Sequence, residues 1–427
     1  MKRLLYILGS ALLAFGMTAN AVASAIVSAP RKTEVPRVRW KTDLIKIAIS
    51  DSLTQPSSNV KIASDVSGAI SRSLQAWQNV ADIQFQIESS DRQSVSPSGV
   101  IGDGVNLITV AQTPENVLLF SKNPLSEPAK TRVFFNRKGL ITEADIVLNP
   151  FQQFSTDGTF GTFDLEATLT HEIGHLLGLR HSGVLGSTMA NTLSKNGVFG
   201  YSDFGSRTLA ASDIAAIREL YGITSTEDNC CGSIAGKIST ANVRTQKSLR
   251  VWAEENGTGR VIAQIDTASD GSFRMGGMPP GTYTVFWQKN DDLSQSEIGE
   301  LGLIKLAAGE TKILNGSAIV GHSDLELNYA GLNSQLADAA VSLAPGREYT
   351  IYVGGKKLDP ANVKFEFNSP FLTVSAASMM SHDFGDGISV VSFVLTVSPE
   401  SPSGEYSIFA IDKSGSRSCM IGAIDIQ

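Results

Sequence analysis

Three of the chain's five histidines lie within residues 169–191, LTHEIGHLLGLRHSGVLGSTMAN. The apolar pattern around the first two predicts a helix over residues 165–177, with Asp164 as its N-cap. His171 and His175 are four residues apart, so they lie one turn apart on the same face of this helix. Two imidazoles in this arrangement can bind one Zn²⁺ at about 2.0–2.1 Å.

The residues that follow complete a metal site. Glu172 comes directly after His171 and can reach a water molecule bound at the same metal. Gly178 predicts the end of the helix, because glycine adopts the left-handed conformation without steric cost. The chain can then turn so that His181 supplies a third nitrogen. Three nitrogen ligands leave a fourth position for water, which indicates one catalytic zinc with Glu172 as general base. The alternative, three histidines in a core without metal, would bury polar rings without compensation.

The pattern His-Glu-x-x-His-x-x-Gly-x-x-His at residues 171–181 resembles the metzincin zinc proteases. Further details resemble the matrixins, the family of the matrix metalloproteinases. Ser182 follows the third histidine, and Met189 matches the Met-turn of the family. The resemblance covers residues 36–222 and includes the segments TRVFFNRKGLITEADIVLN (131–149) and LAASDIAAIRELYG (209–222).

The resemblance implies an α/β domain with a twisted, mostly parallel sheet, an antiparallel edge strand and three helices. It implies a secreted zinc-dependent endopeptidase that hydrolyses peptide bonds with a zinc-activated water and Glu172 as the base. In the family the methionine matching Met189 lies beneath the metal and is not a ligand. The strand at residues 131–135 would bind a protein or peptide substrate in extended form, or would be a plain sheet edge. Asp213 would brace the Met-turn or capture a processed N-terminal amine; a simple carboxylate at a helix start is the alternative.

The sequence departs from the family in three places. Arg132 and Val147 stand where matrixins carry histidines of a second, structural zinc, so we expect that site to be absent. Asn149 replaces an aspartate that often binds calcium, which leaves Ca²⁺ binding open. No cysteine precedes Trp40 to act as the latch that keeps matrixins inactive.

The first residues, MKRLLYILGSALLAFGMTANAVASA (1–25), are typical of a secretory signal peptide. We therefore expect a secreted protein, extracellular or, in a bacterium with an outer membrane, periplasmic. No later segment is apolar enough to span a membrane. The formal net charge of −7, without a basic cluster, argues against nucleic acid as a partner. We expect a monomer.

After Gly222 the pattern changes to short strands and turn signals, which predicts two all-β sandwich domains. Residues 232–320, with DGSF and PPGTYTV, resemble carboxypeptidase regulatory-like (transthyretin-like) domains. Residues 326–427, with SGEYSIFAIDKSGS, resemble bacterial immunoglobulin-like domains. The break suggests that residues 36–222 fold on their own.

Two further functions fit the same sequence. One is a catalytically silent, surface-binding or adhesive protein that uses its C-terminal β domains. The other is a zinc hydrolase that acts on something other than peptides. The edge strand favours a peptide substrate over the second of these.

The chain has three cysteines, and they cannot all pair within one chain. In an oxidising compartment we expect a bond from Cys230 or Cys231 to Cys419. A vicinal bond between Cys230 and Cys231, and three free thiols, are the alternatives.

Overall fold

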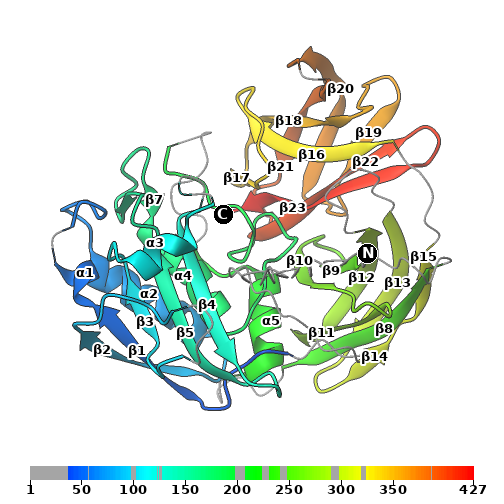
Figure 1. Ribbon diagram of the computed structural model, residues 1–427. Coiled ribbons are helices and arrows are strands. Elements are labelled where there is room, and N and C mark those ends of the chain that lie inside the picture. Colours follow the sequence, from blue (N-terminus) through cyan, green and yellow to red (C-terminus); the bar gives the residue numbers. More distant parts are fainter. Residues whose placement is uncertain are drawn as a thin grey trace, which may run out of the picture.

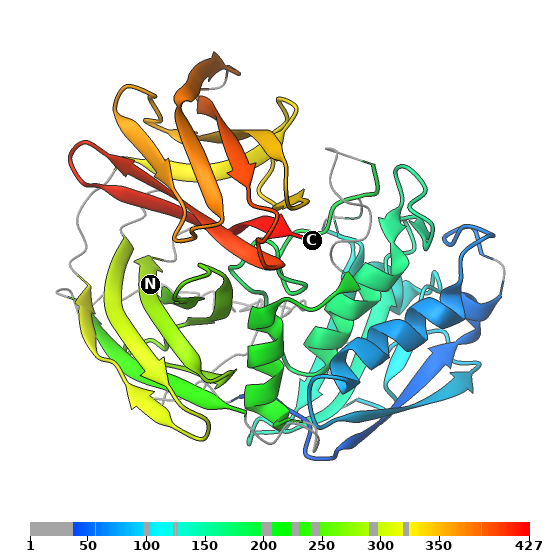
Figure 2. The same ribbon diagram turned by 180° about the vertical axis from the view of Figure 1, so that it is seen from behind.

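The chain forms three lobes, which Figures 1 and 2 show from opposite sides. The computed structural model describes residues 37–55, 57–97, 102–122, 124, 127–197, 207–223, 230–240, 248–289, 298–318, 324–385 and 387–427. The expected signal peptide, residues 1–25, lies outside them. As predicted, the chain has several domains, rich in β-sheet and with few helices.

The first lobe is built on a five-stranded sheet with the order β2-β1-β3-β5-β4. Three of its pairings are parallel, and β4 joins the edge antiparallel to β5. Its strands and the small β6–β7 pair are β1 (Leu44–Ser50), β2 (Gln84–Ser90), β3 (Leu107–Thr109), β4 (Ala129–Phe135), β5 (Ile141–Leu148), β6 (Phe154–Ser155) and β7 (Phe163–Asp164). The predicted sheet, mostly parallel with one antiparallel edge, agrees with this topology.

Three helices of more than ten residues cover the sheet or flank it, the number that the family resemblance implies: α2 (Val66–Gln78), α4 (Leu165–Leu176) and α5 (Ala211–Tyr221). On α2, the buried side chains Ile70, Leu74 and Trp77 recur at spacings of three and four. The short helices α1 (Asp51–Thr54) and α3 (Pro114–Leu119) are additional to the predicted three. They are too short to show a period and depend on side-chain caps from Ser50 and Thr113.

The second lobe packs two sheets around one core. One has the order β10-β9-β12-β13, and the other is β11-β8-β14, with β15 also paired to β8. The strands are β8 (Gly232–Thr240), β9 (Leu249–Glu255), β10 (Val261–Asp266), β11 (Ser272–Met278), β12 (Gly281–Lys289), β13 (Ile298–Leu306), β14 (Thr311–Ile313) and β15 (Gly316–Ala318).

The third lobe is also made of two four-stranded sheets, with the orders β16-β18-β21-β20 and β17-β23-β22-β19. The strands are β16 (Glu326–Leu332), β17 (Val341–Leu343), β18 (Glu348–Lys356), β19 (Val363–Glu366), β20 (Leu372–Asp383), β21 (Ser389–Val397), β22 (Gly404–Asp412) and β23 (Arg417–Ile426). Both β lobes fall within the ranges expected for sandwiches, and the domain boundaries themselves stay predictions.

The three lobes share buried surface. Helix α5 lies between the first sheet and the second lobe in both views (Figures 1 and 2), and its Ala215 belongs to the core of the second lobe. Val184, from the first lobe, lies in a cluster with residues of both β lobes: Trp252, Val261, Phe286, Phe409, Cys419 and Ile421. The expectation that residues 36–222 fold independently does not account for these contacts. A chain cut after Gly222 would expose the side chains of Ala215 and Val184 to water.

A buried carboxylate also joins the second and third lobes. Glu254, on β9, accepts hydrogen bonds from Trp252 Nε1 at 2.9 Å, Ser407 Oγ at 2.7 Å and Asn368 Nδ2 at 2.7 Å. Burial raises its pKa, and the three donors oppose that shift.

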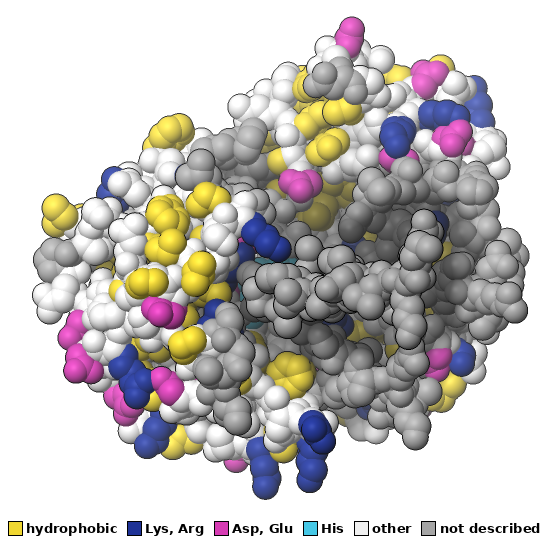
Figure 3. All heavy atoms as spheres, in the orientation of Figure 1, with side chains coloured by type: hydrophobic (Ala, Val, Ile, Leu, Met, Phe, Trp, Pro, Cys, Tyr) yellow, Lys and Arg dark blue, Asp and Glu magenta, His cyan; other side chains and the backbone are white. Residues whose placement is uncertain are grey.

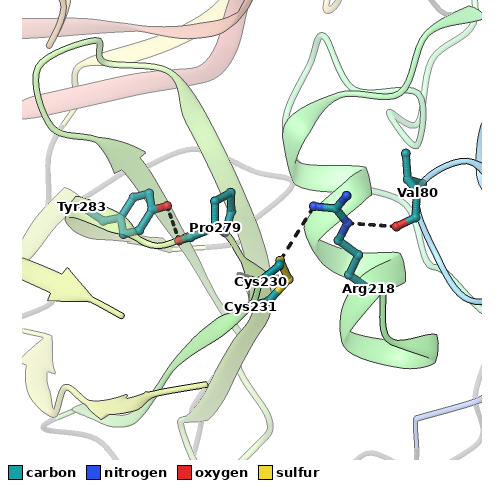
Figure 4. The surroundings of a disulfide bond; sticks show 6 residues. All are labelled: Val80, Arg218, Cys230, Cys231, Pro279 and Tyr283. Atoms are coloured by element: carbon teal, nitrogen blue, oxygen red, sulfur yellow. Dashed lines mark hydrogen bonds between the residues drawn. A yellow bond between two sulfur atoms is a disulfide. The ribbon is translucent and has the colours of Figure 1, made fainter. Parts of the chain in front are cut away.

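The expected long-range disulfide is wrong. The disulfide joins Cys230 to Cys231, and Cys419 is free and buried. Figure 4 shows the disulfide between α5 and the second lobe, where Arg218 donates to Val80 O and lies 3.8 Å from Cys230 Sγ. Cys419 is enclosed in the cluster shared by the lobes. It is therefore held apart from Cys230 and Cys231, the two residues that the expected bond would have joined it to.

No helix among the described residues is long and apolar enough to cross a membrane.

The shared cluster leads to a prediction for stability. Phe286 is 2% exposed and packs on Trp252 and Phe409. Phe286→Ala in the full chain should lower the free energy of unfolding by about 3–5 kcal/mol, because it leaves a cavity between lobes. Denaturant unfolding measures the change. Phe160→Ala is the control, since Phe160 is 77% exposed, and an equal loss in both variants would contradict the role of the shared cluster.

Candidate metal centre

Helix α4 carries the first part of the site, and all its residues are buried. The predicted cap is present, because Ala167 N donates to Asp164 Oδ1 at 2.8 Å. Arg207 binds the same carboxylate through Nη2 at 2.6 Å and Nε at 3.0 Å. A buried anion at the start of the helix is thus neutralised by a neighbouring guanidinium.

The three histidines converge at the end of α4. Gly178, with φ of 96°, ends the helix, and a Cβ there would lie 2.1 Å from Val38 O. The chain turns so that the ring of His181 comes within 4.7 Å of that of His175 and 5.3 Å of that of His171. One nitrogen from each of the three lies within 4.8 Å of the others. Figure 3 shows a small area of histidine side chain beside Lys and Arg side chains.

Backbone carbonyls set the direction of two rings. His171 Nδ1 donates to Thr188 O at 2.7 Å, and His175 Nδ1 donates to Leu179 O at 2.9 Å. These bonds leave each Nε2 with its lone pair, and His175 Nε2 lies 3.1 Å from His181 Nε2. Ligands of one tetrahedral zinc are roughly 3.3–3.4 Å apart. The set therefore fits a zinc ion bound through three imidazole nitrogens.

Burial favours the neutral form of all three rings. It lowers the pKa of His171 to about 4 and that of His175 well below the ordinary value; neighbouring histidines add to both shifts. It also lowers the pKa of His181, although Glu127 opposes this. Neutral imidazole is the form that binds a metal, so the rings need no deprotonation near neutral pH.

Glu172 follows His171 on α4, and its side chain is buried. Burial raises the pKa of its carboxyl group to about 7, against a hydrogen bond from Thr131, and Glu127 raises it further. Thr131 Oγ1, on the edge strand β4, lies within hydrogen-bond distance of Glu172 Oε2 and 3.1 Å from Glu172 O. The strand and the helix are therefore linked at the carboxylate.

Met189 packs against helix α4. It is buried, and a Cβ on Gly174 would lie 2.3 Å from its sulfur and 2.9 Å from Trp77 Cζ2. Only a glycine at position 174 lets the methionine approach α4 so closely. Ser182 N donates to Met189 O at 2.7 Å, which ties the residue after the third histidine to the methionine.

Asp213 braces this turn, one of the roles considered for it. Its Oδ2 accepts from Thr188 N at 2.8 Å, and hydrogen bonds from Ala210 and Met189 also lower its pKa. Burial outweighs them and raises that pKa to about 7. The carboxyl group also lies in the first turn of α5, so the helix-start position and the bracing role coincide.

The positions that correspond to the second zinc site of the family are occupied by Arg132 and Val147, which make other contacts. The strand register places Asp145 opposite Arg132, while Val147 is buried opposite Lys130. Asp145 accepts from Leu107 N at 3.0 Å and Ser96 N at 3.2 Å, and burial raises its pKa to about 7.

Arg132 contributes to the same region, because its guanidinium donates to Ser96 O. Burial lowers the pKa of Arg132, and the charges of Asp145 and Glu143 oppose that shift.

Asn149 uses its side chain to hold a loop. Its amide group donates to Glu127 O at 2.6 Å and Pro124 O at 2.9 Å, and its Oδ1 accepts from Phe151 N at 2.9 Å. The amide nitrogen is thereby directed at the neighbouring backbone.

Sequence reasoning did not assign Thr131, Thr188 or Arg207 to the site. The motif spacing shows which residues can bind a metal. A backbone carbonyl such as Thr188 O can come from any residue type, so the sequence does not identify it. A threonine in a predicted edge strand is common, so only its contact with Glu172 singles Thr131 out.

Comparisons with known proteins agree with the geometry of this part. The model of the matrixin family matches residues 128–222, from just before β4 to the end of α5. Interstitial collagenase of Oryctolagus cuniculus is 27% identical over 158 residues, 37% of this chain and 28% of the collagenase. The chain therefore spans little more than a quarter of that relative. These similarities support a metallopeptidase at the level of the family.

Solved structures were also compared with the chain. A candidate adhesin from Bacteroides ovatus shows 12% identity and a TM-score of 0.18, over 45% of this chain and 85% of its own. BcpA, the major pilin subunit of Bacillus cereus, shows 12% identity and a TM-score of 0.16, over 46% and 69%. Similarity at these scores carries no argument about function.

The contact beneath the helix gives a prediction. Gly174→Ala would normally stabilise a helix by up to about 1 kcal/mol. Here the added methyl group meets Met189 and Trp77, so we expect a net loss of about 1–3 kcal/mol from overpacking. In a double-mutant cycle with Met189→Ala, the two losses should be less than additive. Strict additivity would show that Met189 does not lie against position 174.

Proposed function

We propose that this chain is a secreted, zinc-dependent endopeptidase of matrixin type. Its catalytic domain is the metzincin-like α/β domain at residues 36–222. The convergence of three neutral imidazoles at one point, together with the buried carboxyl group of Glu172 directly after His171 in the chain, carries the proposal. The family match over residues 128–222 supports it. Secretion rests on the sequence of residues 1–25 alone.

His171, His175 and His181 would hold the zinc ion. When bound there, zinc polarises the scissile carbonyl and lowers the pKa of a water molecule. Glu172 would accept the proton of that water and pass it to the leaving amine. Thr131 orients the carboxylate, and a buried carboxyl group with a raised pKa is suited to accept and return one proton.

The edge strand offers a place for an extended peptide. β4 stands at the end of the sheet order, paired to β5, and Arg132, Val133 and Phe134 are partly exposed. A peptide added to this edge would pair with the backbone of β4. Since Thr131 on the same strand contacts Glu172, the bound peptide would run past the carboxylate. We expect this substrate to be protein or peptide and the enzyme to act as a monomer.

The alternative is a silent surface-binding protein that uses its β lobes. An open pocket of about 500 Å³ on the third lobe is the feature that favours it. The pocket is lined by Leu332, Asn333, Glu348, Tyr349, Thr350 and Tyr352. A silent protein has no use for a buried carboxyl group next to a histidine of a three-imidazole cluster, so the metal centre favours the peptidase.

Glu172→Gln tests the role of the base. The amide fills the same space and can still accept a hydrogen bond from Thr131, but it cannot take a proton. We expect zinc binding and folding to persist, while peptide hydrolysis falls by about 10²–10⁴-fold. Activity on a quenched peptide and zinc content are measured together. Glu88→Gln, at an exposed position of β2, is the matched control; equal activity in both variants would remove Glu172 from the mechanism.

Metal analysis tests the ligands. The purified chain should contain about one equivalent of zinc, since one three-histidine cluster occurs among the described residues. His175→Ala should lose the zinc, whereas His382→Ala on β20 should keep it. Two tightly held zinc ions would contradict the expected loss of the second site.

A further inference from the structure

A short loop connects two parts of the metal centre. Residues 182–188, hereafter the ligand loop, begin directly after His181 and end at Thr188, whose carbonyl oxygen orients His171. Bonds to the first lobe hold the two ends: Ser182 N donates to Met189 O, and Thr188 N donates to Asp213 Oδ2. A displacement of the loop would therefore move one ligand and the carbonyl that directs another.

The second lobe holds the beginning of the ligand loop. Gln264 Oε1, on β10, accepts from Gly183 N at 3.0 Å and from Ser182 Oγ at 3.4 Å. Arg250, on β9, packs against the same glycine, so that a Cβ there would lie 2.1 Å from Arg250 Nε. Both strands belong to the same sheet of the second lobe, and its edge strand β10 lies beside α5 (Figure 1).

The third lobe holds the middle of the loop. Leu185 N donates to Ile421 O at 2.9 Å, and Gly186 N donates to Gly422 O at 3.0 Å, both on β23. Between these contacts Val184 is fully buried in the cluster shared by the β lobes. A Cβ on Gly186 would lie 2.8 Å from Glu405 Cγ, so the loop and β22 are in close contact.

We propose that the two β lobes position the metal ligands: Gln264, Ile421 and Gly422 fix the ligand loop, and through it His181 and the Thr188 carbonyl. This inference rests on the proposed zinc centre. Without the lobes, ordering a loop that contains two glycines would cost conformational entropy each time the site assembles. With them, the ligands are held before the metal arrives, and pre-organised ligands bind a metal more tightly.

Gly422→Ala in the full chain tests the contact with the third lobe. Gly422 has φ of 62°, and a Cβ there would lie 2.4 Å from Val184 Cγ1, so the substitution pushes β23 away from the loop. Gly415→Ala is the matched control, because Gly415 has φ of 86° with nothing within 4 Å of its Cβ position. The two variants impose the same kind of backbone strain, but only Gly422→Ala disturbs the loop.

The first measurements are of metal binding, and peptide hydrolysis is measured afterwards. We expect Gly422→Ala to release zinc to a chelator about tenfold faster than wild type, while Gly415→Ala releases it at the wild-type rate. The visible spectrum of the cobalt-substituted protein should change in Gly422→Ala alone, since its bands depend on ligand number and geometry. With a peptide substrate, kcat should fall more than KM rises. Equal zinc release and equal spectra in the two variants would overturn the inference.

A second variant guards against unfolding of the third lobe. Gln264→Ala removes the acceptor of Gly183 N and leaves β23 unchanged, so it should also speed zinc release. Gln86→Ala, at an exposed position of β2, should not. If Gln264→Ala holds zinc as wild type does, the second lobe has no part in positioning the site.

The same measurements separate this inference from the proposed function. A wild-type chain that binds zinc without hydrolysing any peptide would overturn the peptidase, while zinc release would still decide the role of the lobes. A wild-type chain that binds no zinc would overturn both.

Discussion

Two backbone carbonyls, those of Thr188 and Leu179, fix the orientation of two imidazoles in the metal centre. Each carbonyl accepts the Nδ1 proton and so leaves Nε2 as the free lone pair. Leu179 reaches its place because Gly178 turns the chain at the end of α4. Thr188 reaches its place because Asp213 on α5 binds its amide. The helices, the turn and the loop thus serve one requirement, that unprotonated nitrogens meet at a point.

Much of this arrangement could be predicted from the residues themselves. The spacing of His171, Glu172 and His175 on an apolar helix specifies a shared face, and Gly178 marks the end of that helix. The strand at residues 44–50 and the helix through Ile70 and Trp77 can also be predicted from the sequence, because alternation and a period of 3.6 are local properties. The structure has both, at β1 and α2.

Other features depend on tertiary contacts, which a single sequence does not display. The link between Thr131 and Glu172 joins residues 41 positions apart, and the bond from Gly183 to Gln264 spans 81. The cysteines show the same difficulty, since oxidation state and spacing allowed several pairings. Burial of Cys419 in a shared core settled which pairing the fold permits. The change of sequence pattern after Gly222 suggested separable lobes, yet the lobes share that core. A change in pattern indicates a different kind of secondary structure and does not show which segments are in contact.

The carboxylate of Glu254 has a further consequence for how the lobes come together. A carboxyl group removed from water is tolerated only when its oxygens are hydrogen-bonded, and here two of the donors, Ser407 and Asn368, come from the third lobe. Apolar contacts such as those of Phe286 tolerate sliding, since they depend on area more than on direction. A rotated docking would keep much of that area but would remove these two donors from Glu254. Glu254 therefore favours a single orientation of the third lobe on the second. It disfavours similar orientations that hydrophobic burial alone would allow.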